Sequence, residues 1–172
     1  MKAYLKKLSS TLALVLFVSL AAFAQRIAIV DVNKILESIE EYQNAQTQLD
    51  NLAAQWRQEI AQEYDLIKGM YNKFQAEQVL LSDEARRQRE EAIIEKEKQV
   101  RDLQKERFGP EGELFKRRQG LVRPIQDRVF SAIESYAQER GFDFIFDKSS
   151  ASGMIFSNPE YDKTTVVLNK LK

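Results

Sequence analysis

The residues that most often carry catalysis are missing from this chain of 172 residues. It has no histidine, so it lacks the commonest general base and the commonest transition-metal ligand. Its six glycines, at positions 69, 109, 112, 120, 141 and 153, form no phosphate-binding loop, and no Gly-Lys-Ser/Thr occurs. Acidic residues are plentiful, but on helix surfaces they are more typical of solvated charge than of a catalytic pair. We therefore expect no enzyme activity, no cofactor and no metal.

The remaining chemistry is that of binding. Two groups of side chains near the middle of the chain could contact a partner. One is apolar and adaptable, because methionine is flexible and aromatic rings supply contact area: Met70, Tyr71, Phe74, Val79, Leu80 and Leu81. The other is a basic cluster that could attract acidic partners: Arg86, Arg87 and Arg89. In the alternative interpretations, Tyr71 and Phe74 complete a helix–helix seam, and the arginines form a solvated face with Glu90 and Glu91.

The first 24 residues have the pattern of a secretory signal peptide. Lys2, Lys6 and Lys7 precede an apolar stretch over residues 12–23, and the small-x-small pattern at 22–24 predicts cleavage after Ala24. The stretch is short for a membrane anchor, which needs roughly 20 apolar residues. Cleavage would leave 23 basic and 26 acidic residues, a net charge of −3. The chain has no cysteine, so we expect an exported protein that folds without disulfides.

A long helix is expected over residues 34–78. Apolar residues recur there at steps of three and four, which is the heptad rhythm of a coiled coil: Ile35, Ile39, Tyr42, Ala45, Leu49, Leu52, Trp56, Ile60, Tyr64, Ile67, Tyr71 and Phe74. At 1.5 Å per residue such a helix would span roughly 65–70 Å. Asn33 could cap its start. The rhythm fails at residues 79–81, where we expect the tip of a hairpin near 78–83.

The return helix should begin after a cap at Ser82 and be held loosely, because its apolar stripe is sparse: Ala85, Ala92, Ile93, Val100 and Leu103. Residues 109–112, Gly-Pro-Glu-Gly, predict a break. Helix should resume near Glu113, continue past Pro124 and end at Gly141.

Both ends of the chain contain short apolar runs that predict a small body. Strands are expected at 26–32, 143–147 and 153–157, and a last helix at about 164–171. The core of this body, or a contact between copies, should contain six apolar residues: Ile27, Ile29, Val30, Phe144, Ile145 and Phe146. The expected fold class is α+β, with a long antiparallel coiled-coil hairpin (34–118) inserted in a small oligomerisation body (25–33 with 119–172). So small a body is marginal alone, which favours oligomerisation.

Several segments, taken in order, resemble the Skp/OmpH-like family of periplasmic chaperones. They are Ile27-Ala28-Ile29-Val30-Asp31-Val32-Asn33-Lys34-Ile35-Leu36, Pro124-Ile125-Gln126-Asp127, Gly141-Phe142-Asp143-Phe144-Ile145-Phe146-Asp147-Lys148 and Tyr161 to Leu171. The break at 109–112 looks like a feature of the Bacteroidetes-type members. The resemblance implies a homotrimer whose mobile helical arms enclose a cavity and hold unfolded outer-membrane proteins in the periplasm, without ATP. Met70, Tyr71, Phe74, Val79, Leu80, Leu81, Arg86, Arg87 and Arg89 would then contact the client.

The charge balance sets a limit on this resemblance. The enterobacterial protein is strongly basic, whereas this chain after cleavage is slightly acidic, so no lipopolysaccharide or anionic-lipid site is carried over and membrane association is expected to be peripheral at most. A nucleic-acid partner is not expected either, because there is no strongly basic face. The rival interpretation is a structural spacer or adaptor of the cell envelope, which the heptads fit equally well.

Overall fold

The computed structural model describes residues 25–150 and 154–171, and the expected signal peptide (1–24) lies outside them. The chain forms two compact units, which are described separately. The strand unit contains residues up to Val32 together with Ala132–Lys170, and the hairpin unit contains Asn33–Ser131 with Leu171. The α+β fold class is confirmed. The predicted domain boundaries, 25–33 with 119–172 and 34–118, stay a prediction.

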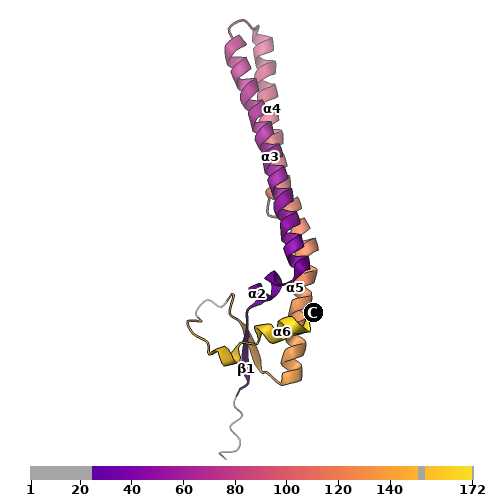
Figure 1. Ribbon diagram of the computed structural model, residues 1–172. Coiled ribbons are helices and arrows are strands. Elements are labelled where there is room, and N and C mark those ends of the chain that lie inside the picture. The colour runs from indigo at the N-terminus through magenta and orange to yellow at the C-terminus, as the bar shows by residue number, and fades with distance from the viewer. Residues whose placement is uncertain (1–24, 151–153, 172) are drawn as a thin grey trace, which may run out of the picture. The chain divides into compact units, whose positions relative to one another are not determined.

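The hairpin unit is built on two long antiparallel helices, α3 (Glu40–Glu77) and α4 (Asp83–Phe108), which lie side by side in Figure 1. The buried residues of α3 largely follow the predicted heptads: Ala45, Leu49, Ala53, Trp56, Ile60 and Ile67. On α4 only Ile93 and Val100 are buried, and Ala92, expected in the stripe, is exposed. Ile60, Ile67 and Val100 form one apolar cluster, against which Leu103 and Phe108 pack.

The helix expected from residue 34 is interrupted near its start. A short helix, α2 (Val32–Glu37), precedes α3, and Ile39 between them has extended backbone angles. The Ser38 hydroxyl donates a hydrogen bond to the Lys34 carbonyl at 2.7 Å, a local bond that competes with helix continuation. The predicted cap at Asn33 is wrong, because helix already begins at Val32.

The turn between α3 and α4 covers residues 78–82. The Ser82 side chain accepts a hydrogen bond from the Ala85 amide at 3.3 Å, so the predicted cap is present. At the other end of α4, Gly109–Gly112 interrupt the helix as predicted, and α5 (Glu113–Arg140) then runs past Pro124. The first part of α5 belongs to the hairpin unit, where Arg128 Nη2 lies 2.6 Å from Glu41 Oε2 of α3.

The strand unit is centred on β1 (Ile27–Val30), which pairs in parallel with β2 (Phe144–Asp147). Ile27 stands opposite Phe144, and Val30 stands opposite Asp147. A 3-10 turn, η1 (Pro159–Tyr161), leads to a bridge between Asp162 and Ile29. The unit ends in α6 (Thr164–Lys170), whose Val167 is fully buried.

One expectation about the strand unit needs correction. The third strand, predicted at 153–157, is not formed by Met154–Ser157, whose Ile155 and Phe156 are exposed; Gly153 lies outside the described residues. Gly141 ends α5 as predicted, with a φ of +64° that a residue bearing a side chain adopts at a cost.

Candidate functional site

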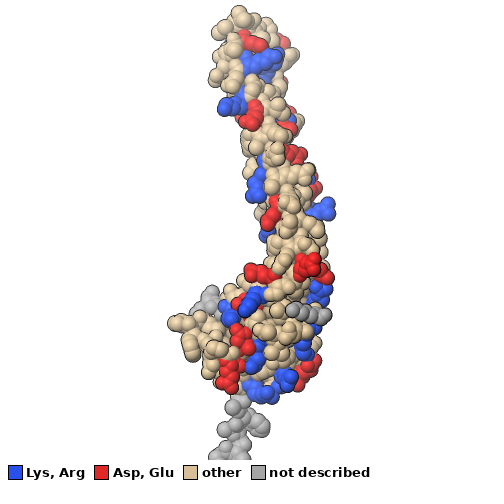
Figure 2. Space-filling view, in the orientation of Figure 1, with Lys and Arg blue, Asp and Glu red and all other residues tan. Residues whose placement is uncertain are grey.

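The end of the hairpin presents apolar side chains that nothing in the described part of the chain covers. Val79 and Leu80 are 82% and 84% exposed, because residues 78–82 are a turn with no facing helix. Leu81 is half-buried beside them. Figure 2 shows charges of both signs along the hairpin and mainly uncharged surface at its end. Large exposed apolar side chains grouped in this way are typical of an interaction surface.

A small groove lies below this turn, between α3 and α4. It has a volume of 160 Å³ and is lined by Tyr71, Phe74, Glu90, Ile93 and Ile94. Ile94 is 60% exposed, and it is a candidate contact residue that the sequence analysis missed because its neighbour Ile93 fills the predicted stripe. The lining of the groove combines two aromatic rings and two isoleucines with one acid, Glu90.

The predicted apolar residues divide between contact surface and seam. Tyr71 is 41% exposed, whereas Met70 and Phe74 are half-buried. The Tyr71 hydroxyl lies 3.0 Å from Glu97 Oε1. That hydrogen bond, with partial burial and the carboxylate charge, raises the pKa of Tyr71. Tyr71 therefore links α3 to α4 and is still partly exposed, so its contact with a partner stays a prediction.

The three arginines of the basic cluster have different surroundings. Arg86 is half-buried, and its Nη2 donates to the Gln78 carbonyl at 3.3 Å while Nη1 lies 4.0 Å from Asp83. Arg86 thus helps to hold the turn. Arg87 and Arg89 are exposed. Within residues 25–150 and 154–171 no arginine of the cluster pairs with Glu90 or Glu91, so that expected pairing is wrong.

The apolar residues assigned to the body are not all core. Ile29 and Val30 are buried and Ile27 and Ile145 are half-buried, but Phe144 and Phe146 are 49% and 46% exposed. The two rings stack at 6.2 Å between centroids, because residues i and i+2 of a strand share a face. In the single chain these phenylalanines are surface residues, so of the two predicted roles, core or contact between copies, only the contact remains for them, as a prediction.

A polar network at the end of the two strands was not predicted. Lys148 Nζ lies 2.8 Å from Asp162 Oδ2 and 3.8 Å from Asp31 Oδ2. The Asp31 amide donates to Thr164 Oγ1 at 2.9 Å, and the Val32 amide donates to Asp147 Oδ1 at 3.1 Å. These bonds tie the C-terminal segment to β1.

Two acids of this network, Asp162 and Asp147, have lowered pKa values. Burial alone would raise the pKa of Asp162, but hydrogen bonds from Lys148 and Thr164 and the ammonium charge outweigh it and lower the pKa to about 2. Hydrogen bonding to Asp162 raises the pKa of Lys148 in turn, against its partial burial. The pKa of Asp147 is also lowered, because bonds from Ser149, Ser150 and two backbone amides outweigh its burial. Asp147, Lys148 and Asp162 are thus charged at neutral pH and their bonds are internal, so their role is structural.

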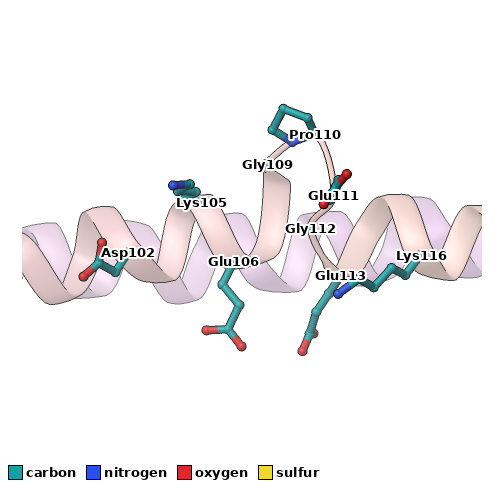
Figure 3. Close-up of a pocket in the computed structure, with 9 residues that line it drawn as sticks. All are labelled: Asp102, Lys105, Glu106, Gly109, Pro110, Glu111, Gly112, Glu113 and Lys116. Atoms are coloured by element: carbon teal, nitrogen blue, oxygen red, sulfur yellow. The ribbon is translucent and has the colours of Figure 1, made fainter.

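A hollow of 620 Å³ adjoins the loop Gly109–Gly112 (Figure 3). Pro110 stands away from the helices, while Glu106 and Glu113 point to the opposite side (Figure 3). Nearby, Arg107 pairs with Glu113 and lies 4.7 Å from the centre of the Trp56 ring, which meets Phe108 edge-on. These contacts join α4 and α5 to α3 across the break. The hollow has charges of both signs on exposed side chains, which does not indicate one class of ligand.

Two further searches covered the described residues alone. Among them no group of three or more acidic, histidine or cysteine side chains is placed to hold a metal ion. None of their helices is both long and apolar enough to cross a membrane.

Comparisons with known proteins agree with this architecture. A search of curated proteins found no match. A protein from Caulobacter crescentus CB15, assigned as an OmpH-like outer membrane chaperone, has a similar structure with a TM-score of 0.67. The likeness covers 86% of this chain and 84% of that one at 15% sequence identity, so it shows a common fold. A family model described as outer membrane protein (OmpH-like) matches residues 26–171. Because that match covers most of the sequence, the chain belongs to the OmpH-like family.

Proposed function

We propose that this protein is an ATP-independent periplasmic holdase chaperone, which binds unfolded outer-membrane proteins between helical arms and prevents their aggregation. Membership of the OmpH-like family and the description of the Caulobacter protein support a chaperone role. The observation that carries the proposal is the apolar end of the hairpin, with Val79 and Leu80 almost fully exposed. A spacer that only separated two envelope components would gain nothing from such exposure.

The client chemistry fits this surface. An unfolded outer-membrane strand alternates apolar and polar residues and has no partner for its apolar face in water. Weak contacts to Val79, Leu80 and the groove at Tyr71 would cover part of that face. Each contact is small, so binding strength comes from several tethered arms acting on one client, and release needs no nucleotide.

Several arms require several copies. In the strand unit Phe144 and Phe146 are half-exposed, and with them Ile155 and Phe156 form apolar surface available to another copy. Covering these side chains would also enlarge a core that is small for an independent domain. The resemblance to the Skp/OmpH-like chaperones implies three copies.

The test is aggregation of a client. A urea-unfolded outer-membrane barrel protein is diluted into buffer with and without the chain from residue 25, and light scattering is followed without ATP. We expect suppression of aggregation and a soluble complex of one client per oligomer. A stable oligomer that leaves the client to aggregate would support the spacer or adaptor instead.

A matched pair of variants tests the assigned surface. Val79→Gln/Leu80→Gln removes apolar area at exposed positions, so the fold should persist while suppression weakens several-fold, because each buried apolar side chain contributes about 1.5–3 kcal/mol. The control Val79→Ile/Leu80→Met keeps the apolar character and should act like the unaltered chain. Equal activity of both variants would remove the hairpin end from the client-binding surface.

A further inference from the structure

A second groove runs along one face of α5, away from the residues assigned above to client binding. It has a volume of 360 Å³, and all of its lining residues come from α5. Phe115 and Phe130 stand at its ends and are 43% and 54% exposed, while Val122 between them is buried. The groove therefore has an exposed aromatic ring near each end and polar or charged side chains along most of its length.

The length of the groove suits an extended chain. Phe115 and Phe130 are fifteen positions apart, which corresponds to about 22 Å along the helix. An extended peptide advances about 3.3 Å per residue, so roughly seven residues would cover this length. Gln119 and Gln126 line the groove between the two rings, and their amides can donate to and accept from an extended backbone.

The charge of the groove indicates which peptides it prefers. Arg118 and Arg123 line it, with Asp127 as the one acid. Within residues 25–150 and 154–171 neither arginine forms an ion pair or another polar contact. Their charges are therefore available to a partner with acidic side chains, and the groove as a whole is positive.

We propose that this face of α5 binds an extended client segment of about seven residues in which aromatic or aliphatic side chains alternate with acidic ones. The proposal rests on the holdase function and adds a second attachment point. The apolar end of the hairpin selects for hydrophobicity alone, whereas the α5 groove also selects for negative charge. The phenylalanines contribute apolar contact, and the arginines favour acidic over basic sequences.

Two synthetic peptides test the proposal on the whole chain from residue 25. One has eight residues in which Phe and Val alternate with Glu, and its counterpart has Lys in place of every Glu. Fluorescence anisotropy at low salt should show at least tenfold tighter binding of the Glu peptide. Because the interaction between exposed charges is screened, this preference should largely disappear in 1 M salt.

Variants assign the binding to the groove. Arg118→Gln/Arg123→Gln should weaken binding of the Glu peptide about three- to tenfold, as expected for the loss of two exposed ion pairs. The affinity for the Lys peptide should not change. Phe115→Ala/Phe130→Ala should weaken the binding of both peptides. The control, Lys116→Gln/Arg117→Gln, removes two charges from the same helix without altering a groove residue and should change neither affinity.

Three outcomes would overturn the proposal. The arginine variant could bind the Glu peptide as tightly as the control does. The unaltered chain could suppress barrel aggregation yet bind neither peptide, which would leave the holdase function intact. Finally, the phenylalanine variant could have a lower mass in light scattering, which would show that the groove joins copies of the chain. If the chain bound the Glu peptide but failed to suppress barrel aggregation, the holdase proposal would fail instead.

Discussion

At the scale of single residues, the polar network around Asp162 shows how charge fixes the C-terminal segment to β1. Lys148 reaches Asp162 from the end of β2, and Asp162 also accepts hydrogen bonds from the Thr164 amide at 2.9 Å and hydroxyl at 2.5 Å. A carboxylate with this many donors is favoured in its charged form, which is why its pKa falls to about 2 despite partial burial. The folded state therefore binds this proton more weakly than the unfolded chain.

This difference predicts an acid-sensitive contribution to stability. The folded pKa of Asp162 lies below its ordinary value of 3.8, so the contribution is complete above about pH 4 and is lost as the pH falls towards 2. It should amount to about 2 kcal/mol. Urea unfolding at pH 7 and at pH 3 should show Asp162→Asn less stable at pH 7 and less sensitive to acid.

The matched control is Asp50→Asn, because Asp50 is exposed on α3. It should follow the unaltered chain at both pH values, since its side chain is exposed to solvent on the helix surface. If Asp162→Asn lost as much stability on acidification as Asp50→Asn, Asp162 would not be the source of the acid sensitivity.

At the scale of elements, the break between α4 and α5 is a compact turn with specific steric demands. The Gly109 amide donates to the Lys105 carbonyl at 2.8 Å, and the Gly112 amide donates to the Gly109 carbonyl at 2.9 Å. A Cβ on Gly112 would meet the Glu106 carbonyl oxygen at 2.7 Å and the Gly109 nitrogen at 2.9 Å. These contacts are with backbone atoms, which cannot rotate away, so the turn excludes a side chain here.

Gly112→Ala should therefore destabilise the hairpin by about 1–3 kcal/mol, because the added methyl forces the backbone to shift. Gly120→Ala, inside α5 with nothing within 4 Å of the added Cβ, is the matched control and should stabilise by about 0.5–1 kcal/mol. Urea unfolding monitored by circular dichroism measures both. Trp56, the one tryptophan of the sequence, gives a second signal because it packs beside the break. Equal effects of the two variants would refute the steric account.

At the scale of the whole molecule, the distribution of exposed apolar surface separates two tasks. The hairpin unit exposes Val79 and Leu80 at its turn, and the strand unit exposes Phe144 and Phe146 on β2. Val79 and Leu80 lie in a turn that no helix or strand of the described residues faces. The second pair sits on a two-stranded sheet, and such a sheet is marginal unless its apolar face is covered. We therefore propose that the first pair contacts clients and that the second forms contacts between copies.

Light scattering on variants of each surface tests this division between client contacts and contacts between copies. Phe144→Thr/Phe146→Thr keeps strand-compatible residues but removes the aromatic face, so the measured mass should fall towards that of a single chain. Val79→Gln/Leu80→Gln should leave the mass unchanged while client holding weakens. An unchanged mass for the Phe144/Phe146 variant would place the contacts between copies elsewhere on the chain.

The hairpin was predictable because its signals are local. The steps of three and four from Ala45 to Ile67 predict the buried face of α3, and Ser82 and residues 109–112 mark where helices begin and end. The break at Ser38 and Ile39 was missed because the apolar heptad positions continue through it, while only the backbone changes: the Ile39 amide donates to the Leu36 carbonyl at 3.0 Å. The α5 groove was missed for another reason: whether Phe115 and Phe130 are exposed depends on which elements lie beside α5, and residue spacing does not give this.

The sequence by itself therefore determined the helices, their turns, the α+β class and the absence of histidine and cysteine chemistry, because periodicity and capping act between near neighbours in the chain. Only the tertiary structure decided the pairing of β1 with β2, the loss of the expected strand at 153–157 and the exposure of Phe144 and Phe146. A strand exists only where another segment supplies its hydrogen bonds, and an apolar side chain is buried only where another element covers it. Both conditions depend on residues far apart in the sequence.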